Sequence, residues 1–273
     1  MNDGDQVGIE SKGRKSGSSS LVRGLKIIRL LCEAPAPLSL AKLARALAMD
    51  PGNLHRLIRT LQDEGWVSRL NEGNEYIVGP LAMNNFDPWH PVHSFRRESY
   101  PILKLLHDQT EETAAVILFL GTERVVMDTI HGKLTLSSYY DVRLVSPIHG
   151  SASGKILLAS IPDEMHAEIL GSEPYVRHTD RTPTTYKELA PRISDVRQNC
   201  YEISRDEAFN GLVAYGAPIR YRDQTLGCLV LTASSTEIDP ENDISYALKT
   251  RDSAELLSNS VPSIHPLKNF LIG

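Results

Sequence analysis

Apolar residues recur at helical spacing between residues 50 and 65. They occupy positions i, i+3, i+4 and i+7 of one face: Leu54, Leu57, Ile58 and Leu61. Asp50 is a residue type that caps helix N-termini, and Pro51 suits the first turn, where its missing N–H costs no hydrogen bond. Gly65 is a typical helix stop. The pattern therefore predicts one amphipathic helix with both ends marked.

The opposite face of this helix is polar. Arg56 and Arg59 point away from the apolar stripe at 3.6 residues per turn. The residues beside them can donate or accept hydrogen bonds: Asn53, His55, Thr60 and Gln62. Such a face can contact the phosphates and base edges of DNA, or it can be the solvated surface of an ordinary helix. The neighbouring segments help to decide between these two interpretations.

Those segments complete a winged helix-turn-helix pattern. A helix is predicted over residues 21–34, and a second helix follows Ser39, a natural N-cap. Alternating residues at 66–70 and 75–78 flank an Asn/Gly turn and predict a hairpin. In this arrangement of residues 20–80 the third helix reads DNA and the hairpin contacts the backbone or minor groove. Short three-helix units also serve as protein-interaction modules. The predicted core comprises Leu25, Ile28, Leu40, Leu43, Leu47, Leu54, Leu57, Ile58, Leu61 and Trp66.

Eight side chains of this region are expected to contact DNA. They belong to the start of the second helix, the polar face of the third helix and the hairpin: Ser39, Lys42, Asn53, His55, Arg56, Arg59, Thr60 and Arg69. The charge distribution agrees with this expectation. Residues 1–70 carry 11 Lys and Arg against 7 Asp and Glu, whereas residues 71–273 carry 18 against 27. A basic N-terminal region on an acidic chain suits contact with a polyanion at that end.

Composition excludes several other classes of protein. The chain of 273 residues is 41% hydrophobic and 23% charged, and no apolar run approaches the roughly 20 residues of a membrane span. Residues 1–19 are polar and lack the apolar region of a secretory signal, so we expect a disordered lead-in. Cys32, Cys200 and Cys228 form no CxxC pattern. We expect them to be buried, reduced thiols in a cytoplasmic protein.

Prolines interrupt residues 81–94, which we interpret as a linker. Each proline removes a donor and clashes with the preceding turn, so no unbroken helix can pass through this segment. We expect a short helix or coil over residues 80–85 and a new helix over about residues 92–109. His90 and His93 also lie here, but the segment offers no third strong ligand, and no metal is expected.

Residues 95–260 alternate strand-like and helix-like patterns, which predicts a mixed α/β domain. Strands are predicted at residues 114–120, 124–132 and 134–142. A helix is predicted over residues 184–199, and a closing helix begins after Glu237. Residues 261–273 are expected to form a loose tail.

Small residues precede an apolar helix pattern within residues 146–159. Three residues separate Gly150 from Gly154, and Ile156 follows Lys155, so the segment does not match a phosphate-binding P-loop. Open N–H groups at a helix start do attract anions. A carboxylate ligand would suit Gly150, Ser151, Ala152 and Ser153. The alternative is that these residues only cap the helix. We expect no cofactor.

Several of these segments resemble the IclR family of bacterial transcriptional regulators. In the first domain they are residues 20–28, 38–44, 55–61, 65–67 and 76–79. In the second domain they are the Pro-x-His, small-residue and Gly-Lys run at 147–155 and the segments 200–207, 211–219 and 226–234. The resemblance implies a GAF-like effector-binding domain with an antiparallel sheet. The chain departs from the family in its proline-broken linker and in Cys200, where glycine is usual.

By the same resemblance, a ligand would lie between the sheet and the small-residue helix start. The further pocket positions that it implies are Ser204, Arg205, Asp206, either Ala214 or Tyr215, Val230 and Thr232. Arg205 stands where an acid often occurs, and Val230 stands where a serine often occurs. Arg205 could pair bidentately with a carboxylate, or it could be a surface arginine.

The expected function is a ligand-responsive, sequence-specific transcriptional regulator that senses a small, carboxylate-bearing metabolite. One winged helix-turn-helix buries too little surface for tight specific binding, so a homodimer or homotetramer on a pseudo-palindromic operator is expected. The alternatives are an enzyme that uses the second domain and a protein-interaction adaptor that binds no DNA. The enzyme is disfavoured because the second domain has no Gly-x-Ser-x-Gly motif, no metal triad and no convincing Cys–His pair.

Overall fold

The computed structural model describes residues 19–34, 36–70, 74–83, 90–133 and 146–272. The chain divides into two compact units, a head of residues 1–86 and a body of residues 87–273. Most of the predicted lead-in and the predicted strand at residues 134–142 lie outside the described residues.

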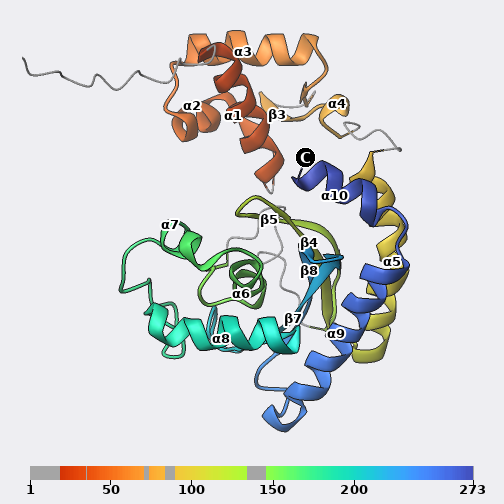
Figure 1. Ribbon diagram of the computed structural model, residues 1–273. Coiled ribbons are helices and arrows are strands. Elements are labelled where there is room, and N and C mark those ends of the chain that lie inside the picture. Colours follow the sequence, from red (N-terminus) through yellow and green to blue (C-terminus); the bar gives the residue numbers. More distant parts are fainter. Residues whose placement is uncertain (1–18, 35, 71–73, 84–89, 134–145, 273) are drawn as a thin grey trace, which may run out of the picture. The chain divides into compact units, whose positions relative to one another are not determined.

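The head consists of three main helices and a small antiparallel sheet (Figure 1). The helices are α1 (Ser19–Glu33), α2 (Leu40–Leu47), α3 (Pro51–Asp63) and the single-turn α4 (Pro80–Met83). The strands are β1 (Leu38–Ser39), β2 (Val67–Arg69) and β3 (Glu75–Val78). They pair in the order β1-β3-β2, so the predicted hairpin is confirmed and gains a third, two-residue strand. This is a winged helix-turn-helix.

The ends of the head helices are set by the residues that the sequence marks. The Asp50 carboxylate accepts a hydrogen bond from the Asn53 backbone N–H at 3.0 Å, and Pro51 occupies the first turn of α3. The Ser39 hydroxyl likewise accepts from the Lys42 backbone N–H at the start of α2. Gly65 has a φ of 72°, a conformation that disfavours other residues and helps to end α3. The predicted start of α2 is therefore confirmed, and so are the two end signals of α3.

The core of the head differs from the prediction at α1. The buried side chains are Ile27, Leu31, Leu43, Leu54, Ile58, Val67 and Tyr76. Leu25 was predicted to be buried, but it is 57% exposed, and Leu21 beside it is 63% exposed. The cause is that α1 carries two apolar strips, and the strip containing Ile27 and Leu31 packs on α2 and α3. The other strip remains on the surface of the head.

The body is built on a five-stranded antiparallel sheet of order β5-β4-β8-β7-β6. Its strands are β4 (Thr113–Leu120), β5 (Glu123–Ile130), β6 (Glu202–Arg205), β7 (Leu212–Tyr221) and β8 (Gln224–Ser234). Its helices are α5 (Pro91–Thr110), α6 (Ala152–Ala159), α7 (His166–Leu170), α8 (Tyr186–Asn199), α9 (Asp243–Ser260) and α10 (Ile264–Ile272). Two single-turn 3-10 helices, Asp163–Met165 and Pro240–Asn242, complete the described elements. The predicted mixed α/β fold with an antiparallel sheet is confirmed.

Helices cover both faces of this sheet. Helices α5 and α9 lie along one face, and α6 and α8 lie along the other (Figure 1). Alternate residues of each central strand therefore enter different cores. Tyr215 and Leu231 belong to the core under α5 and α9, whereas Ala214 and Val230 belong to the core under α6. Helix α6 packs so closely that a Cβ at Gly216 would lie 2.6 Å from the Ile156 side chain.

The C-terminal segment corrects the prediction of a loose tail. It forms helix α10, in which Ile264 and Leu267 are buried against the core that lies under α5 and α9. Pro262 precedes the helix instead of ending the ordered chain, and the apolar spacing of residues 264–271 gives the helix a packing face.

The linker histidine His90 caps α5, because its ring accepts a hydrogen bond from the Val92 backbone N–H. Among the described residues, no group of three or more His, Cys, Asp or Glu side chains could hold a metal ion. Cys228 is buried, but Cys32 is exposed, because it lies on the outer side of α1. In the described part of the chain, no helix is long and apolar enough to cross a membrane.

Candidate DNA-binding surface and effector site

The polar face of α3 is open to solvent in the head. Arg56 and Arg59 are exposed, and so are His55 and Thr60. The Arg56 guanidinium is 3.4 Å from the Asn53 side-chain oxygen, and the Thr60 hydroxyl donates to the Arg56 carbonyl at 3.2 Å. These contacts hold the polar side chains on one side of the helix while Leu54 and Ile58 are buried on the other, a geometry suited to a DNA-reading helix.

Three further residues predicted to contact DNA lie next to this face or on the wing. Ser39 is half-buried and acts as the N-cap of α2, and Lys42 in the first turn of α2 is exposed. Arg69 at the end of β2 is exposed and donates to the Asn74 side chain across the hairpin. The structure thus presents cations on α2, α3 and the hairpin of one small domain.

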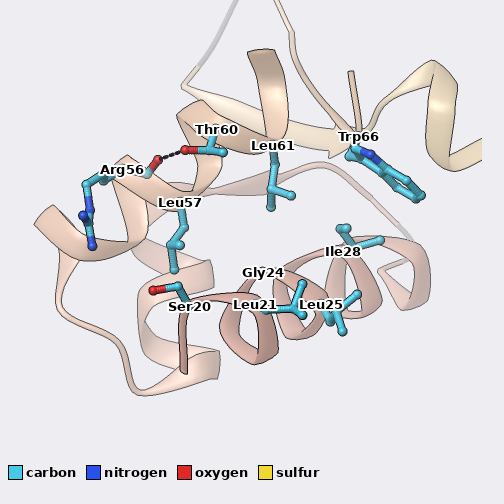
Figure 2. A pocket seen from close by; sticks show the side chains of 10 residues that line it. All are labelled: Ser20, Leu21, Gly24, Leu25, Ile28, Arg56, Leu57, Thr60, Leu61 and Trp66. Carbon is cyan, nitrogen blue, oxygen red and sulfur yellow. Dashed lines mark hydrogen bonds between the residues drawn. The ribbon is translucent and has the colours of Figure 1, made fainter. Parts of the chain in front are cut away.

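An apolar groove runs between α1 and α3 on the surface of the head (Figure 2). Its volume is about 530 Å³. Figure 2 shows Leu21, Leu25 and Ile28 of α1 on one side and Leu57, Leu61 and Trp66 on the other. Of the two exposed leucines in the groove, Leu25 belongs to the predicted core, whereas Leu21 does not. A solvent-facing apolar groove of this kind is a candidate surface for association.

The start of α6 is buried in the body. Residues 149–158 are all buried, and Ser151 caps the helix by accepting from the Gly154 backbone N–H at 3.3 Å. The Ser151 hydroxyl donates to the Pro147 carbonyl at 2.6 Å. A Cβ at position 154 would lie 2.1 Å from the Ile148 carbonyl oxygen, so only glycine fits there. The small residues therefore allow a tight turn directly before the helix.

A guanidinium lies against this helix start. Arg124, the second residue of β5, is 6% exposed. It donates to the Ser151 hydroxyl at 2.8 Å, to the Ser153 hydroxyl at 2.9 Å and to the Ser146 hydroxyl at 3.1 Å, and also to the Ser146 carbonyl. The sequence prediction missed Arg124, because a single arginine in a strand pattern gives no local sign of the helix that it meets.

A cluster of buried charges fixes the next turn of α6. The Lys155 ammonium is fully buried and lies 2.9 Å from a Glu202 carboxylate oxygen, and it also contacts the Glu207 carboxylate. Arg192 of α8 contacts both carboxylates as well. Burial raises the pKa of Glu207, whereas Lys155 and Arg192 act to lower it. The cluster ties α6 to β6, to α8 and to the loop after β6.

Other titratable groups near this helix start are held neutral by burial. Burial lowers the pKa of His149, whose ring nitrogen lies 2.9 Å from the Val176 carbonyl oxygen. Burial strongly raises the pKa of the Cys228 thiol, and the charge of nearby Arg124 opposes that rise. Burial therefore disfavours the charged forms of both His149 and Cys228.

The effector residues suggested by the family resemblance divide into two groups. Ala214 and Val230 face α6 in the same core as Ala152. Thr232 pairs with Ala214 across the neighbouring strand and is fully buried. These positions, with Gly150 to Ser153, are brought together by the fold.

Arg205 and Asp206 do not join that group. Arg205 donates to the Asp243 carboxylate at 2.8 Å and to the Ser235 carbonyl, on the sheet face that α9 covers. Arg205 lies on that face because successive side chains of a strand point to opposite faces of the sheet. The preceding residue, Ser204, points to the other face, where its hydroxyl donates to the Gly150 carbonyl. Asp206 accepts from the Gly211 N–H and so shapes the loop before β7.

A pocket whose wall has a polar part and an apolar part lies beside Arg124. Its volume is about 490 Å³, within the usual range of small-molecule sites. Arg124 and Ser146 line one part of its wall. Apolar side chains line another part: Ile148, Met165 and Ile169. The exposed carboxylates of Glu123 and Glu168 also line the pocket.

The fold and these surfaces define a two-domain transcription regulator with a winged helix-turn-helix head and an α/β body. Comparison with known families agrees with that class. Residues 20–70 match the IclR helix-turn-helix domain, and residues 90–259 match the domain described as bacterial transcriptional regulator IclR C-terminal. The chain belongs to the IclR family of bacterial transcriptional regulators.

Individual relatives span most of the chain at low identity. The HTH-type transcriptional regulator TtgV of Pseudomonas putida is 26% identical over 238 residues, which are 86% of this chain and 89% of that protein. The transcriptional repressor IclR of Escherichia coli is 24% identical over 202 residues, 73% of this chain and 74% of that protein. Both similarities include the head and the body.

Solved structures share the fold. An IclR homologue from Microbacterium hydrocarbonoxydans, complexed with 4-hydroxybenzoate, aligns with a TM-score of 0.79 at 17% identity. The alignment covers 89% of this chain and 99% of that chain. The similarity establishes the arrangement of helices and strands in this protein.

Proposed function

We propose that this regulator binds an operator through α3 and changes its operator affinity when a small carboxylate binds the body near the start of α6. The observation that carries the proposal is that one chain contains both an exposed basic helix face, in the head, and a buried helix start with an arginine beside it, in the body. The family relationship supports a regulatory role, and it favours a body that senses a ligand over one that catalyses a reaction.

In the head, Arg56 and Arg59 supply the sequence-reading contacts, with Asn53, His55 and Thr60 beside them. Arginine pairs bidentately with guanine edges, and asparagine pairs with adenine, so this face can distinguish bases in a major groove. Lys42 and Arg69 are placed for phosphate contacts, which set the register of the head on the duplex. Ser39 contributes through the N-terminus of α2.

We propose that a second copy of the chain packs against the α1 side of the groove between α1 and α3, so that Arg56 and Thr60 on its α3 side stay open to DNA. A pseudo-palindromic operator requires two heads related by a twofold axis, and an exposed apolar groove beside α3 suits their association. Each leucine that becomes fully buried contributes about 1.5–3 kcal/mol. The groove contains Leu21 and Leu25, both more than half exposed in the single chain.

Replacing Leu21 and Leu25 together with Asp should therefore weaken self-association. The dimer dissociation constant should rise by at least about tenfold, because two buried apolar contacts are replaced with charges. Sedimentation velocity on the full-length protein would measure the change. Leu120→Asp is the matched control, since Leu120 is an exposed leucine at the end of β4 in the body. Equal association of the double variant and the wild type would refute the groove as an interface.

In the body, the small-residue helix start and the facing strand positions Ala214, Val230 and Thr232 form the effector region. A ligand can act on DNA binding only through different affinities for two states of the protein. Arg205 is not part of the proposed site, because its guanidinium already pairs with Asp243.

The test is a titration of labelled DNA from upstream of the protein's own gene, followed by fluorescence anisotropy. Pyruvate, benzoate and 4-hydroxybenzoate are added separately, each at millimolar concentration. At least one acid should change the operator dissociation constant by about 5- to 150-fold, the usual range of allosteric coupling. If no small molecule alters the affinity, the body does not act as a sensor.

A further inference from the structure

The end of β7 runs past its neighbour β6 at one edge of the body sheet. Strand β6 begins at Glu202, opposite Gly216, so residues 217–221 of β7 have no β6 partner on that side. Pro218, which lacks a backbone N–H, lies in this stretch, as is usual for a sheet edge. The Arg220 backbone N–H donates to the Ser258 hydroxyl of α9 at 2.9 Å, so a side chain takes the place of a strand partner.

A cavity of about 520 Å³ lies at this open edge. It is lined by the end of β7, the last residues of α8 with Cys200 after them, and α9. Three arginines line it, one from β7, one from the turn after β7 and one from α9: Arg220, Arg222 and Arg251. The cavity shares no residue with the effector region proposed at the start of α6. Its wall gathers cations from three segments of the chain.

Two of these arginines have no carboxylate to balance their charge. In the described part of the chain, neither Arg220 nor Arg222 forms an ion pair. Arg220 donates one N–H to the Cys200 sulfur at 3.3 Å, and a thiol is a weak acceptor. The Arg222 guanidinium lies 5.4 Å from the centre of the Tyr221 ring, a contact of its face that leaves the N–H groups at its edge available.

Negative groups near the cavity offset only part of this charge. Arg251 donates to Asp252 at 3.0 Å in a pair that is open to water and therefore weak. Glu255, one helical turn after Arg251, is the only carboxylate among the residues described as lining the cavity. The C-terminus of α8 adds about half a negative charge. The cavity therefore keeps a positive potential.

The lining residues favour a phosphate group over a single carboxylate. A phosphate monoester carries about two negative charges near neutral pH and presents three strong acceptor oxygens. Guanidinium groups from three segments can contact several of these oxygens, and each can bind two in parallel. The rest of the wall includes the amides of Gln198, Asn199 and Asn259, which can hydrogen-bond hydroxyl groups.

We propose that this cavity binds the phosphate of a small, hydroxyl-bearing phosphate ester through Arg220, Arg222 and Arg251. The site adds a second ligand to the regulator and goes beyond the proposed function. It does not depend on the carboxylate effector or on the start of α6, so either proposal can fail alone.

Isothermal titration calorimetry on the full-length wild type tests the ligand class. The probes are ribose 5-phosphate, ribose and inorganic phosphate, each at millimolar concentration. Ribose 5-phosphate should bind, and ribose should bind at least about tenfold more weakly, because it lacks the charge-assisted hydrogen bonds of the phosphate. Inorganic phosphate should compete with ribose 5-phosphate. Equal binding of ribose and its phosphate, or no binding of either phosphate, overturns the proposal.

Variants test the arginines. Replacing Arg220 and Arg222 together with Gln should weaken binding of ribose 5-phosphate by at least about tenfold, whereas Arg97→Gln, an exposed arginine of α5, should leave it unchanged. Arg222→Gln alone removes only an exposed side chain and should weaken binding by at least about threefold, so it serves if the double variant does not fold. Wild-type affinity in these variants refutes the site.

Cys200 gives a second measurement, in the unaltered protein. Bound ribose 5-phosphate should slow alkylation of Cys200 by iodoacetamide, because Cys200 lines the cavity, while the rate at the exposed Cys32 of the head stays the same. Peptide mass spectrometry measures both rates. An unchanged rate at Cys200 in the presence of bound ligand places the ligand elsewhere and overturns the proposal. Loss of duplex DNA binding in the double variant, with no binding of ribose 5-phosphate to the wild type, would assign the arginines to DNA instead.

Discussion

Lys155→Met is expected to lower the free energy of unfolding by about 3–5 kcal/mol, the usual cost of removing one partner from a buried ion pair. The ammonium is fully buried, and the carboxylates of Glu202 and Glu207 that it contacts are almost fully buried. Methionine keeps most of the volume and removes the charge. Arg192 then remains as the cation shared by two carboxylates. The two acids would repel each other in a site with little water.

Urea denaturation followed by circular dichroism measures this change. Lys104→Met is the matched control, because Lys104 pairs with Asp108 on the exposed side of α5 and such pairs contribute less than about 1 kcal/mol. A loss of stability no larger than that of the control would show that the buried cluster does not stabilise the body. The cluster matters for function because it holds the first turns of α6, where the effector is proposed to bind.

Local features of the chain predicted the elements of the head. The helix at residues 51–63 is determined by signals that lie within it and at its ends, namely Asp50, Pro51 and an apolar stripe at helical spacing. The hairpin is likewise determined by alternation and a turn. Strand β1 was not predicted, since two residues are too few to show a period.

Features that depend on contacts between distant residues were not predictable in the same way. Leu25 and Ile28 of α1 are predicted to lie in the core, whereas Ile27 and Leu31 are the residues that are buried. Periodicity alone does not show which of two apolar strips meets the neighbouring helices. The partners of Lys155 lie 47 and 52 residues away along the chain. Arg124 meets serines that are 22 to 29 residues away. No local spacing indicates such pairings.

The candidate site likewise contains features that local sequence predicts and features that only the fold determines. The small-residue start of α6 was recognisable from its sequence, and the structure places it against Ala214 and Val230. The orientation of Arg205 depended on which face of β6 it occupies, and its pairing with Asp243 follows from the position of α9. A resemblance identifies a position in a pattern, whereas the strand register decides where its side chain points.

Loss of sequence-specific DNA binding is expected when Arg56 and Arg59 are both replaced with alanine. Each bidentate contact to a base is worth about 1–3 kcal/mol, so losing two of them should lower operator affinity by about 30-fold or more. Both side chains are exposed and are not part of the head core, so the fold should be retained. Arg23→Ala with Lys26→Ala is the matched control, because it removes two exposed charges from α1 of the same domain.

Fluorescence anisotropy of the full-length protein on its labelled upstream DNA, with a scrambled duplex as reference, tests the central claim most directly. The wild type and the α1 control should prefer the upstream DNA, and the Arg56 and Arg59 variant should bind both duplexes with similar, weak affinity. Unchanged preference in that variant, or an equal loss in the α1 control, would contradict the assignment of α3 as the DNA-reading helix.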